Sequence, residues 1–380
     1  MTDVPQGVFE FSTAQSDFRA AVRQFADSGF ASESIRQLME TDTGYDEGTW
    51  SLMARQLGLQ GLIVPERYDG AGAGQVELAI VAEELGKRLA GVPFLSTVVL
   101  ATQLILACGD EDACAAYLPA IAAGDLVATV MLGVPQPTQP VGTARSRDGE
   151  WTIGSASGTA IDGAVADLIV LVADTDDGPG VFVVPADAGG IQRVPLRSID
   201  LTRKQARINL ENVSAKRICA TATAAVVSDV CTAAARALAA ESLGVAQHCL
   251  DDAVGYAAER VQFGRAIGSF QAVKHTCADL YVEVELARSA AYYAAWAADD
   301  GQGADPSHVA HAWCTDTAVR VATENIQIHG GIGITWEHDA HLYLRRAKAN
   351  QLTLGGTDRD IDLLATALRH SVAPAAPVPP

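Results

Sequence analysis

Apolar residues repeat at helical spacing through the first third of the chain. Phe18, Val22 and Phe25 lie three to four residues apart, and a broad apolar stripe in residues 76–89 runs beside charged positions. A repeat of this length predicts amphipathic helices that bury one face. We therefore expect an N-terminal helical domain over residues 1–124.

Near residue 125 the pattern changes to short runs of β-branched and aromatic residues, bounded by Asp, Gly and Pro. The runs are Trp151–Ile153, Leu168–Val172, Val181–Val184 and Ala206–Leu210. Such runs predict strands, and Asp148-Gly149 before the first of them is typical of a tight hairpin turn. We expect a middle antiparallel β domain over residues 125–221.

Helical periodicity returns after this region and continues almost to the end of the chain. The first long helix is rich in small residues, among them Ala240, Gly244 and Ala246, and small side chains let helix axes approach closely. We expect a C-terminal four-helix-bundle domain over residues 222–371. The proline-rich residues 372–380 are expected to form a flexible tail. The three regions together predict an α+β fold.

The composition limits the class of protein and its partners. The chain has 380 residues, 49% of them hydrophobic, which is enough for a large core. Its net charge of −19 opposes binding to nucleic acid or to an anionic membrane, so neither is expected as a partner. The seven cysteines show no paired spacing, and we expect free, mostly buried thiols, the state typical of a reducing cytoplasm.

The sequence shows no pattern typical of a targeting or membrane-spanning segment. Residues 1–6 lack the charged start and apolar run of a signal peptide. No apolar segment approaches the length that a transmembrane helix requires. We therefore expect a cytoplasmic protein.

The stretch Arg260–Gln271 carries the first candidate chemistry. It predicts the end of one helix, a turn marked by Gly264 and Gly268, and the start of another helix that Ser269 is placed to cap. An arginine before such a turn can fork onto a phosphate, and Phe263 offers a flat face for a base or ring. An ordinary connection between two helices explains the same residues equally well.

A second glycine-rich stretch, Gln327–Ile334, favours a ligand-binding role for these residues over an ordinary connection. Its three glycines would let a ligand approach the backbone closely. Together the two stretches resemble the acyl-CoA dehydrogenase family, whose members carry Arg-x-x-Phe-Gly and Gln-x-x-Gly-Gly at this separation. Further segments that match the family, in the same order, are residues 64–72, 83–86, 200–202 and 341–347.

The resemblance implies a fold, a cofactor and a reaction. It implies a flavoprotein that uses FAD to introduce a double bond between the α- and β-carbons of an acyl-CoA substrate, with electron-transfer flavoprotein as the acceptor. In this family FAD lies across a subunit contact, and the subunit that holds its pyrophosphate and adenosine supplies both motifs. The matching positions here are Arg260, Phe263, Gln271, Gln327, Gly330, Gly331 and Thr357.

The family's catalytic base has no counterpart at either of its usual positions. The usual glutamate falls on Gly355, and the earlier position used by some relatives falls on Ala234. The nearest carboxylates are Glu241 and Asp358, for which structural and helix-capping roles are the simpler expectation. The tryptophan and threonine that flank the flavin ring in the family are also replaced, at about residues 159–161.

The chain thus keeps the residues that it would lend to a neighbouring subunit and lacks those of its own catalytic pocket. This asymmetry leads to the hypothesis of a non-catalytic subunit in a mixed tetramer, with a second acyl-CoA dehydrogenase-like subunit that supplies the base. One alternative is a self-sufficient homotetramer with a displaced base. Another is a flavin-free assembly protein on the same scaffold.

Two histidine pairs, His308 with His311 and His338 with His341, stand at i,i+3 spacing and could each face one metal ion. No cysteine or third ligand supports either pair in the nearby sequence. We therefore expect no metal site, and surface or packing roles for these histidines.

Overall fold

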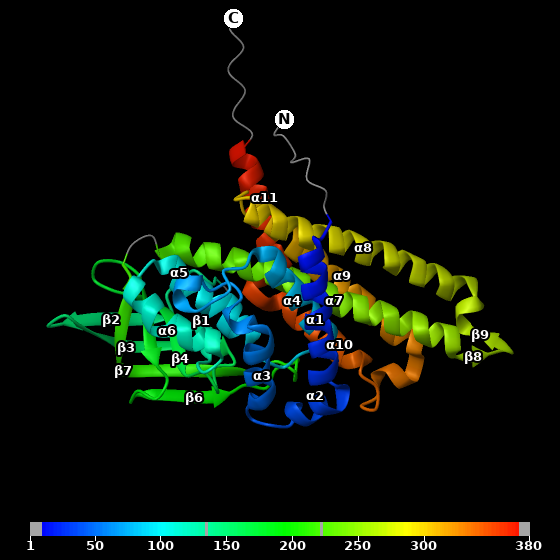
Figure 1. Ribbon diagram of the computed structural model, residues 1–380, viewed down its shortest axis with the longest axis horizontal. Helices are drawn as coiled ribbons and strands as arrows, with labels where there is room; N and C mark the ends of the chain where they lie inside the picture. The colour runs from blue at the N-terminus through cyan, green and yellow to red at the C-terminus, as the bar shows by residue number, and fades with distance from the viewer. Residues whose placement is uncertain (1–9, 134–135, 221–222, 372–380) are drawn as a thin grey trace, which may run out of the picture.

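The computed structural model describes residues 10–133, 136–220 and 223–371. A region of strands lies between two helical regions along the chain, and in space the sheet occupies one end of the molecule while the long helices extend away from it (Figure 1). This order confirms the predicted α+β class, with helical, β and helical regions. The exact domain limits stay a prediction. The predicted tail 372–380 and the N-terminal residues 1–9 lie outside the described residues.

Local sequence sets several helix ends in the N-terminal region. Its elements are α1 (Thr13–Gly29), α2 (Ser32–Met39), α3 (Glu47–Leu57), η1 (Leu59–Gly61), η2 (Glu66–Tyr68), α4 (Gln75–Lys87), the π-helix η3 (Phe94–Thr102), α5 (Gln103–Cys108) and α6 (Glu111–Ala123). Ser12 and Gln15 form a capping box at the start of α1. Asp46 caps α3 by accepting from the Thr49 amide at 2.6 Å, and Gly58 ends that helix at φ 64°.

The strands of this region are β1 (Ala128–Met131), β2 (Gly142–Arg147), β3 (Glu150–Ile161), β4 (Leu168–Asp174), β5 (Gly180–Pro185), β6 (Ile191–Pro195) and β7 (Gln205–Cys219). The four strand runs predicted from the sequence lie within β3, β4, β5 and β7, and the structure adds β1, β2 and β6. The β2–β3 hairpin turns at Asp148 and Gly149, with φ of 55° and 87°. Two successive left-handed residues are what a tight two-residue hairpin turn requires, so this turn confirms its sequence signal.

The sheet closes on itself. Pairing runs β4–β2–β3–β7–β5 and returns from β5 to β4, with β1 and β6 added beside it. Most pairs are antiparallel as predicted, but β1–β4 and β2–β4 are parallel, because long connections between these strands let packing decide their direction. Strand β4 is buried on both faces. Leu168 and Val170 pack with the helices, whereas Ile169 and Leu171 belong to the separate core inside the closed sheet.

The C-terminal region is built around α7, which contacts α4, α8, α9 and α10. Its elements are α7 (Thr223–Glu259), the strands β8 (Val261–Gln262) and β9 (Arg265–Ala266), η4 (Ile267–Ser269), α8 (Gln271–Asp299), α9 (Asp305–His329), η5 (Gly330–Ile334), α10 (Ala340–Leu352), η6 (Thr353–Gly355) and α11 (Gly356–Ser371). A β-carbon on Gly244 of α7 would lie 2.0 Å from the Glu83 carbonyl oxygen of α4. One on Gly86 of α4 would lie 2.3 Å from the Glu241 carbonyl oxygen. The predicted close approach of helix axes therefore occurs, and it depends on these two glycines.

Helix α7 corrects one expectation from the sequence. By length and composition it is apolar enough to cross a membrane, although no segment was expected to be. However, 67% of its most apolar 18-residue window is buried inside the protein. Such burial is typical of the core helix of a globular fold.

The cysteines have the state that the sequence predicts. None of the seven, all of them among the described residues, forms a disulfide: Cys114, Cys231, Cys249 and Cys314 are buried, and the other three are half-buried. Burial raises the pKa of the Cys231 thiol to about 11, which keeps it protonated and unreactive at neutral pH.

Candidate functional site

The stretch Arg260–Gln271 folds into a short hairpin rather than a plain turn. It joins α7 to α8 at the end of the molecule remote from the sheet (Figure 1). Between β8 and β9 stand Phe263 at φ 55° and Gly264 at φ 78°. Phe263 is 91% exposed, so a bulky residue in a strained conformation presents its ring to solvent. Ser269 does not cap α8 as predicted, because the cap position is Phe270 and the serine hydroxyl donates to the backbone of β9 at 2.7 Å.

An aromatic stack brings the two glycine-marked motifs together. Tyr256, near the end of α7, stacks on His329 at the end of α9, with ring centroids 4.2 Å apart. The Arg260 amide donates to the Tyr256 carbonyl at 2.9 Å, and Gly330 directly follows His329. Both motifs therefore lie at the same end of the helical bundle. We call the following residues the clamp: Arg260, Phe263, Gln271, Gln327, Gly330 and Gly331.

The polar side chains of the clamp are available to a ligand. Arg260, Gln271 and Gln327 are exposed, and none of the three bonds through its side chain to another residue in the described part of the chain. A β-carbon on Gly330 or Gly331 would meet open space, so a ligand can approach the backbone there. A guanidinium, two amides and an exposed aromatic ring form a donor set suited to a diphosphate with an attached nucleoside. The clamp therefore fits the diphosphate half of a dinucleotide.

A cavity of about 430 Å³ lies between the sheet and α10, next to Gly355. The sixteen described residues that line it include Thr159, and none of them has an ionisable side chain. At its rim the backbone is left-handed at three successive residues, with φ of 60° at Leu354, 95° at Gly355 and 77° at Gly356. Side chains other than glycine are disfavoured in this conformation. Thr357 follows, half-buried in the first turn of α11.

The two carboxylates nearest to the family's base positions lie in different surroundings. Glu241 Oε1 accepts from Arg203 at 2.7 Å and from Arg346 at 2.9 Å. Burial alone would raise the pKa of Glu241, but the two guanidiniums outweigh burial and lower this pKa to about 2. Asp358 is exposed in the first turn of α11, where negative charge stabilises the helix. Ala234 is fully buried within α7.

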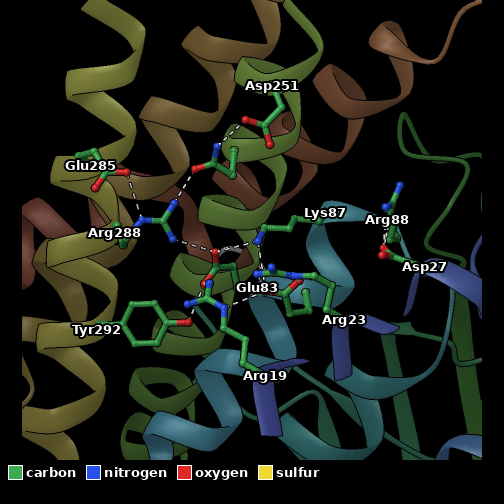
Figure 2. Close-up of polar contacts among 12 residues, drawn as sticks. Arg19, Arg23, Asp27, Glu83, Lys87, Arg88, Asp251, Glu285, Arg288 and Tyr292 are labelled. Atoms are coloured by element: carbon green, nitrogen blue, oxygen red, sulfur yellow. Dashed lines mark hydrogen bonds and ion pairs between the residues drawn. The ribbon is translucent and has the colours of Figure 1, made fainter. Parts of the chain in front are cut away.

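A second cavity, of about 600 Å³, is lined mainly by charged side chains of α1, α4, α7 and α8. Figure 2 shows polar contacts beside it, where Arg19, Lys87 and Arg288 converge on the buried carboxylate of Glu83. Tyr292 also donates to Glu83, at 2.6 Å. Every arginine and lysine that lines this cavity pairs with a carboxylate among the described residues. We therefore assign the cavity to packing between helices and not to anion binding.

The histidine pair on α9 has a packing role, as predicted. His308 and His311 both bond through Nδ1 to Asp360 of α11, at 2.8 and 2.6 Å. All three side chains are buried. Because the carboxylate uses both oxygens, these contacts hold α11 against α9.

Sequence reasoning missed a different histidine group. The structure places His338 beside His329 and Asp252, whereas His341, its neighbour at i,i+3, is not part of the group. The three residues come from α7, from the end of α9 and from the segment before α10. Spacing along the chain could not reveal this grouping. Its one sequence signal is the position of His329 inside the glycine-rich motif.

Comparison with known proteins establishes the family to which the chain belongs. Models of the acyl-CoA dehydrogenase N-terminal and C-terminal domains match residues 12–125 and 217–368. The chain is 35% identical over 322 residues to acyl-CoA dehydrogenase IpdE2 of Mycobacterium tuberculosis. This match covers 83% of this chain and 84% of that protein. The chain therefore belongs to the acyl-CoA dehydrogenase family. Its members are FAD-dependent oxidoreductases that act on CH–CH bonds.

Two solved structures are similar over nearly the whole chain. The ChsE4–ChsE5 complex from Mycobacterium tuberculosis matches with a TM-score of 0.87 and 28% identity, over 97% of this chain and 100% of the matched chain. A Tcur3481–Tcur3483 steroid acyl-CoA dehydrogenase variant matches with a TM-score of 0.86 and 30% identity, over 95% of this chain and 99% of that chain. The fold predicted from the family resemblance is thus confirmed.

Proposed function

We propose that this chain is the non-catalytic subunit of a mixed acyl-CoA dehydrogenase tetramer, in which its clamp completes the FAD site of a second, catalytic subunit. The observation that carries the proposal is the neutral lining of the cavity at Gly355. Removal of an α-proton needs a positioned acceptor within hydrogen-bond reach. The family places that acceptor at this residue, where the described lining of this chain offers no carboxylate.

The backbone at Gly355 supports the same conclusion. Its φ of 95° disfavours any residue with a β-carbon, so a glutamate could not stand there without rearrangement of the loop. The backbone conformation of the loop therefore favours glycine at this position, so the loop differs from a catalytic one by more than the loss of a glutamate side chain. This feature distinguishes the chain from a catalytic subunit that has merely lost its base.

The surroundings of the two remaining carboxylates argue against a self-sufficient homotetramer with a displaced base. Glu241 is held ionised by two arginines, so it is a poor proton acceptor near neutral pH. Asp358 is exposed at the start of α11. The free donors of the clamp argue in turn against a flavin-free assembly protein, because such a protein has no use for them.

The catalytic partner would cover apolar side chains that are exposed on the C-terminal helices. Most of the large hydrophobic residues that are exposed in the described chain lie in this region, among them Val282, Leu286, Trp313 and Trp336. Large apolar side chains that are exposed in the isolated chain are typical of a surface that a partner subunit covers. The similar structures ChsE4–ChsE5 and Tcur3481–Tcur3483, each with two differently named chains, support an unlike partner.

The proposed roles of the clamp follow from its chemistry. When bound, FAD accepts a hydride from the β-carbon of an acyl-CoA thioester. Arg260 would fork onto the diphosphate, Phe263 would cover the nucleoside, and the glycine backbone at Gly330 would admit the phosphate oxygens. Gln271, Gln327 and Thr357 would supply further hydrogen bonds. These residues bind and orient the cofactor, and they move no proton.

The proposal also covers the substrate, the electron acceptor and the cellular location of the complex. We infer that the substrate is a bulky acyl-CoA such as a steroid side-chain thioester, because a relative 30% identical in sequence is described as a steroid acyl-CoA dehydrogenase. The electron acceptor would be electron-transfer flavoprotein, and the complex would act in the cytoplasm. The catalytic subunit would supply the arginines that bind CoA, since this chain carries a net charge of −19.

Co-expression with a candidate catalytic subunit, an acyl-CoA dehydrogenase-like chain with an intact base, tests the proposal. We expect the chain alone to show no dehydrogenation, and the complex to contain one FAD for each pair of unlike subunits. Arg260→Ala should lower the affinity of the complex for FAD by about 10–100-fold, because a charge-assisted contact to phosphate is lost. Arg55→Ala, at an exposed position on α3, is the matched control and should leave FAD binding unchanged.

Two results would contradict the proposal. Dehydrogenation by the purified chain alone, at a rate similar to that of the complex, would show that it carries its own base. Unchanged FAD affinity in the Arg260→Ala complex, with assembly intact by gel filtration, would show that the clamp does not hold the cofactor.

A further inference from the structure

Two histidines and an aspartate meet beside the clamp with the geometry of a metal site. Asp252 lies on α7, His329 ends α9, and His338 lies just before α10. One ligand atom from each residue lies within 4.8 Å of the others, and His329 Nε2 is 3.7 Å from Asp252 Oδ2. We propose that Asp252, His329 and His338 bind a divalent first-row transition-metal ion such as Zn²⁺.

The separation of the ligand atoms suits such an ion. Ligands about 2.0 Å from a tetrahedral zinc stand about 3.3 Å from one another. The 3.7 Å between His329 Nε2 and Asp252 Oδ2 is too long for a hydrogen bond and only a few tenths of an ångström wider than a filled site requires. All three ligand atoms lie within 4.8 Å of one another, so His338 would move inward when an ion binds. No hydrogen bond joins the three side chains to one another in the described part of the chain. A cation would supply the bonds that this group does not make internally.

A single buried residue orients two of the ligands. The Nδ1–H group of His329 donates to the Asn325 carbonyl at 2.9 Å, which leaves the Nε2 lone pair directed at Asp252. The side-chain amide of Asn325 donates to Asp252 Oδ2 at 3.0 Å. Asn325 is fully buried, so both contacts are fixed by packing. Metal-binding histidines and carboxylates are typically held by hydrogen bonds of this kind.

His338 needs one adjustment to join the site through Nε2. Its Nδ1 accepts from the Ala340 amide at 3.1 Å, so in the metal-free protein the ring proton is on Nε2. Coordination would move this proton to Nδ1 and break the Ala340 bond. A bond of this type contributes about 1 kcal/mol, whereas structural zinc binding contributes about 10 kcal/mol or more.

The donor set selects the class of ion. Two imidazoles and one carboxylate favour Zn²⁺, Co²⁺, Ni²⁺ or Fe²⁺ over Mg²⁺ and Ca²⁺, which prefer oxygen ligands. His329 is buried, while Asp252 and His338 are half-exposed, so water can occupy a remaining coordination position. An ion here would tie α7, α9 and the start of α10 together next to Gly330. The site would therefore order the clamp, whichever subunit carries the catalytic base.

Metal titration of the purified chain tests the proposal directly. Metal-free protein is prepared with a chelator and titrated with Zn²⁺ against a competing dye, and separately with Co²⁺ followed by absorbance. We expect one ion per chain and a Co²⁺ spectrum of a site with four or five ligands. Asp252→Asn and His338→Ala should each weaken Zn²⁺ binding at least about 100-fold. His275→Ala, an exposed histidine on α8, is the matched control and should leave the affinity unchanged.

Several outcomes would overturn the metal site. Zn²⁺ binding by the wild-type chain that is no tighter than by Asp252→Asn would do so, and so would a Co²⁺ spectrum of an ion surrounded by six oxygens. Nitrogen NMR of His338 gives a readout that does not depend on a variant. Protonation must move from Nε2 to Nδ1 when Zn²⁺ is added, and an unchanged tautomer refutes coordination through Nε2.

Discussion

The Glu241→Gln substitution tests whether this carboxylate stabilises the fold or acts as a catalytic base. Glu241 accepts from Arg203, Arg346 and the side-chain amide of Asn350, the last at 3.2 Å. Glutamine has nearly the same shape but carries no charge, so the substitution removes the charge pairing and leaves most of the packing. The two guanidiniums would then remain buried beside a neutral amide.

The size of the effect follows from the pKa of Glu241. Burial opposes ionisation, but the arginines lower the pKa from 4.5 to about 2. At about 1.4 kcal/mol per pKa unit, this difference contributes about 3 kcal/mol to the free energy of unfolding at pH 7. Because the folded-state pKa is the lower one, the contribution is complete above pH 4.5 and is lost as the pH falls towards 2. We expect the wild type to exceed the variant by about 3 kcal/mol at pH 7 and by about 1 kcal/mol at pH 3.

Urea denaturation followed by tryptophan fluorescence measures this difference. Glu211→Gln, an exposed glutamate on β7, is the matched control and should leave the midpoint unchanged. The activity of the complex with its partner is measured on the same samples. A Glu241→Gln variant with the wild-type midpoint would refute the structural reasoning. Loss of dehydrogenation at unchanged stability would identify Glu241 as the base and favour the self-sufficient enzyme.

Four further substitutions test other parts of the fold by the same denaturation assay. Gly244→Ala should destabilise by several kcal/mol because its β-carbon would lie 2.0 Å from a backbone oxygen of α4, whereas Gly255→Ala on the same helix meets nothing within 4 Å and should stabilise by about 0.5–1 kcal/mol; equal effects would refute the close contact. Burial raises the pKa of Asp162 to about 6, so its ionisation opposes folding as the pH rises from 3.8 through 6. Asp162→Asn should therefore stabilise by up to about 3 kcal/mol at pH 7 and by little at pH 4, and a loss of stability at pH 7 would contradict this. Tyr292→Phe removes the hydroxyl that donates to Glu83 at 2.6 Å and should destabilise by about 2 kcal/mol, and an unchanged midpoint would show that the arginines suffice.

The sequence by itself determined the elements of the fold and the location of the clamp. The spacing of apolar residues predicts helices or strands because a 3.6-residue or a two-residue repeat places one face in the core. The turn at Asp148-Gly149 could be predicted because its left-handed backbone suits a few residue types. The two glycine-rich motifs also depend on local residue choice. Resemblance to a family therefore located them without knowledge of the packing.

Only the tertiary structure decided which distant side chains meet. The pairing of Glu241 with Arg203 and Arg346 depends on how α7 and α10 pack against the loop before β7. The grouping of Asp252 with His329 and His338 depends in the same way on the packing of α7 and α9, and the parallel pairing of β2 with β4 depends on closure of the sheet. Local periodicity carries no information about such contacts, because it specifies which face of an element is buried and not which element covers it.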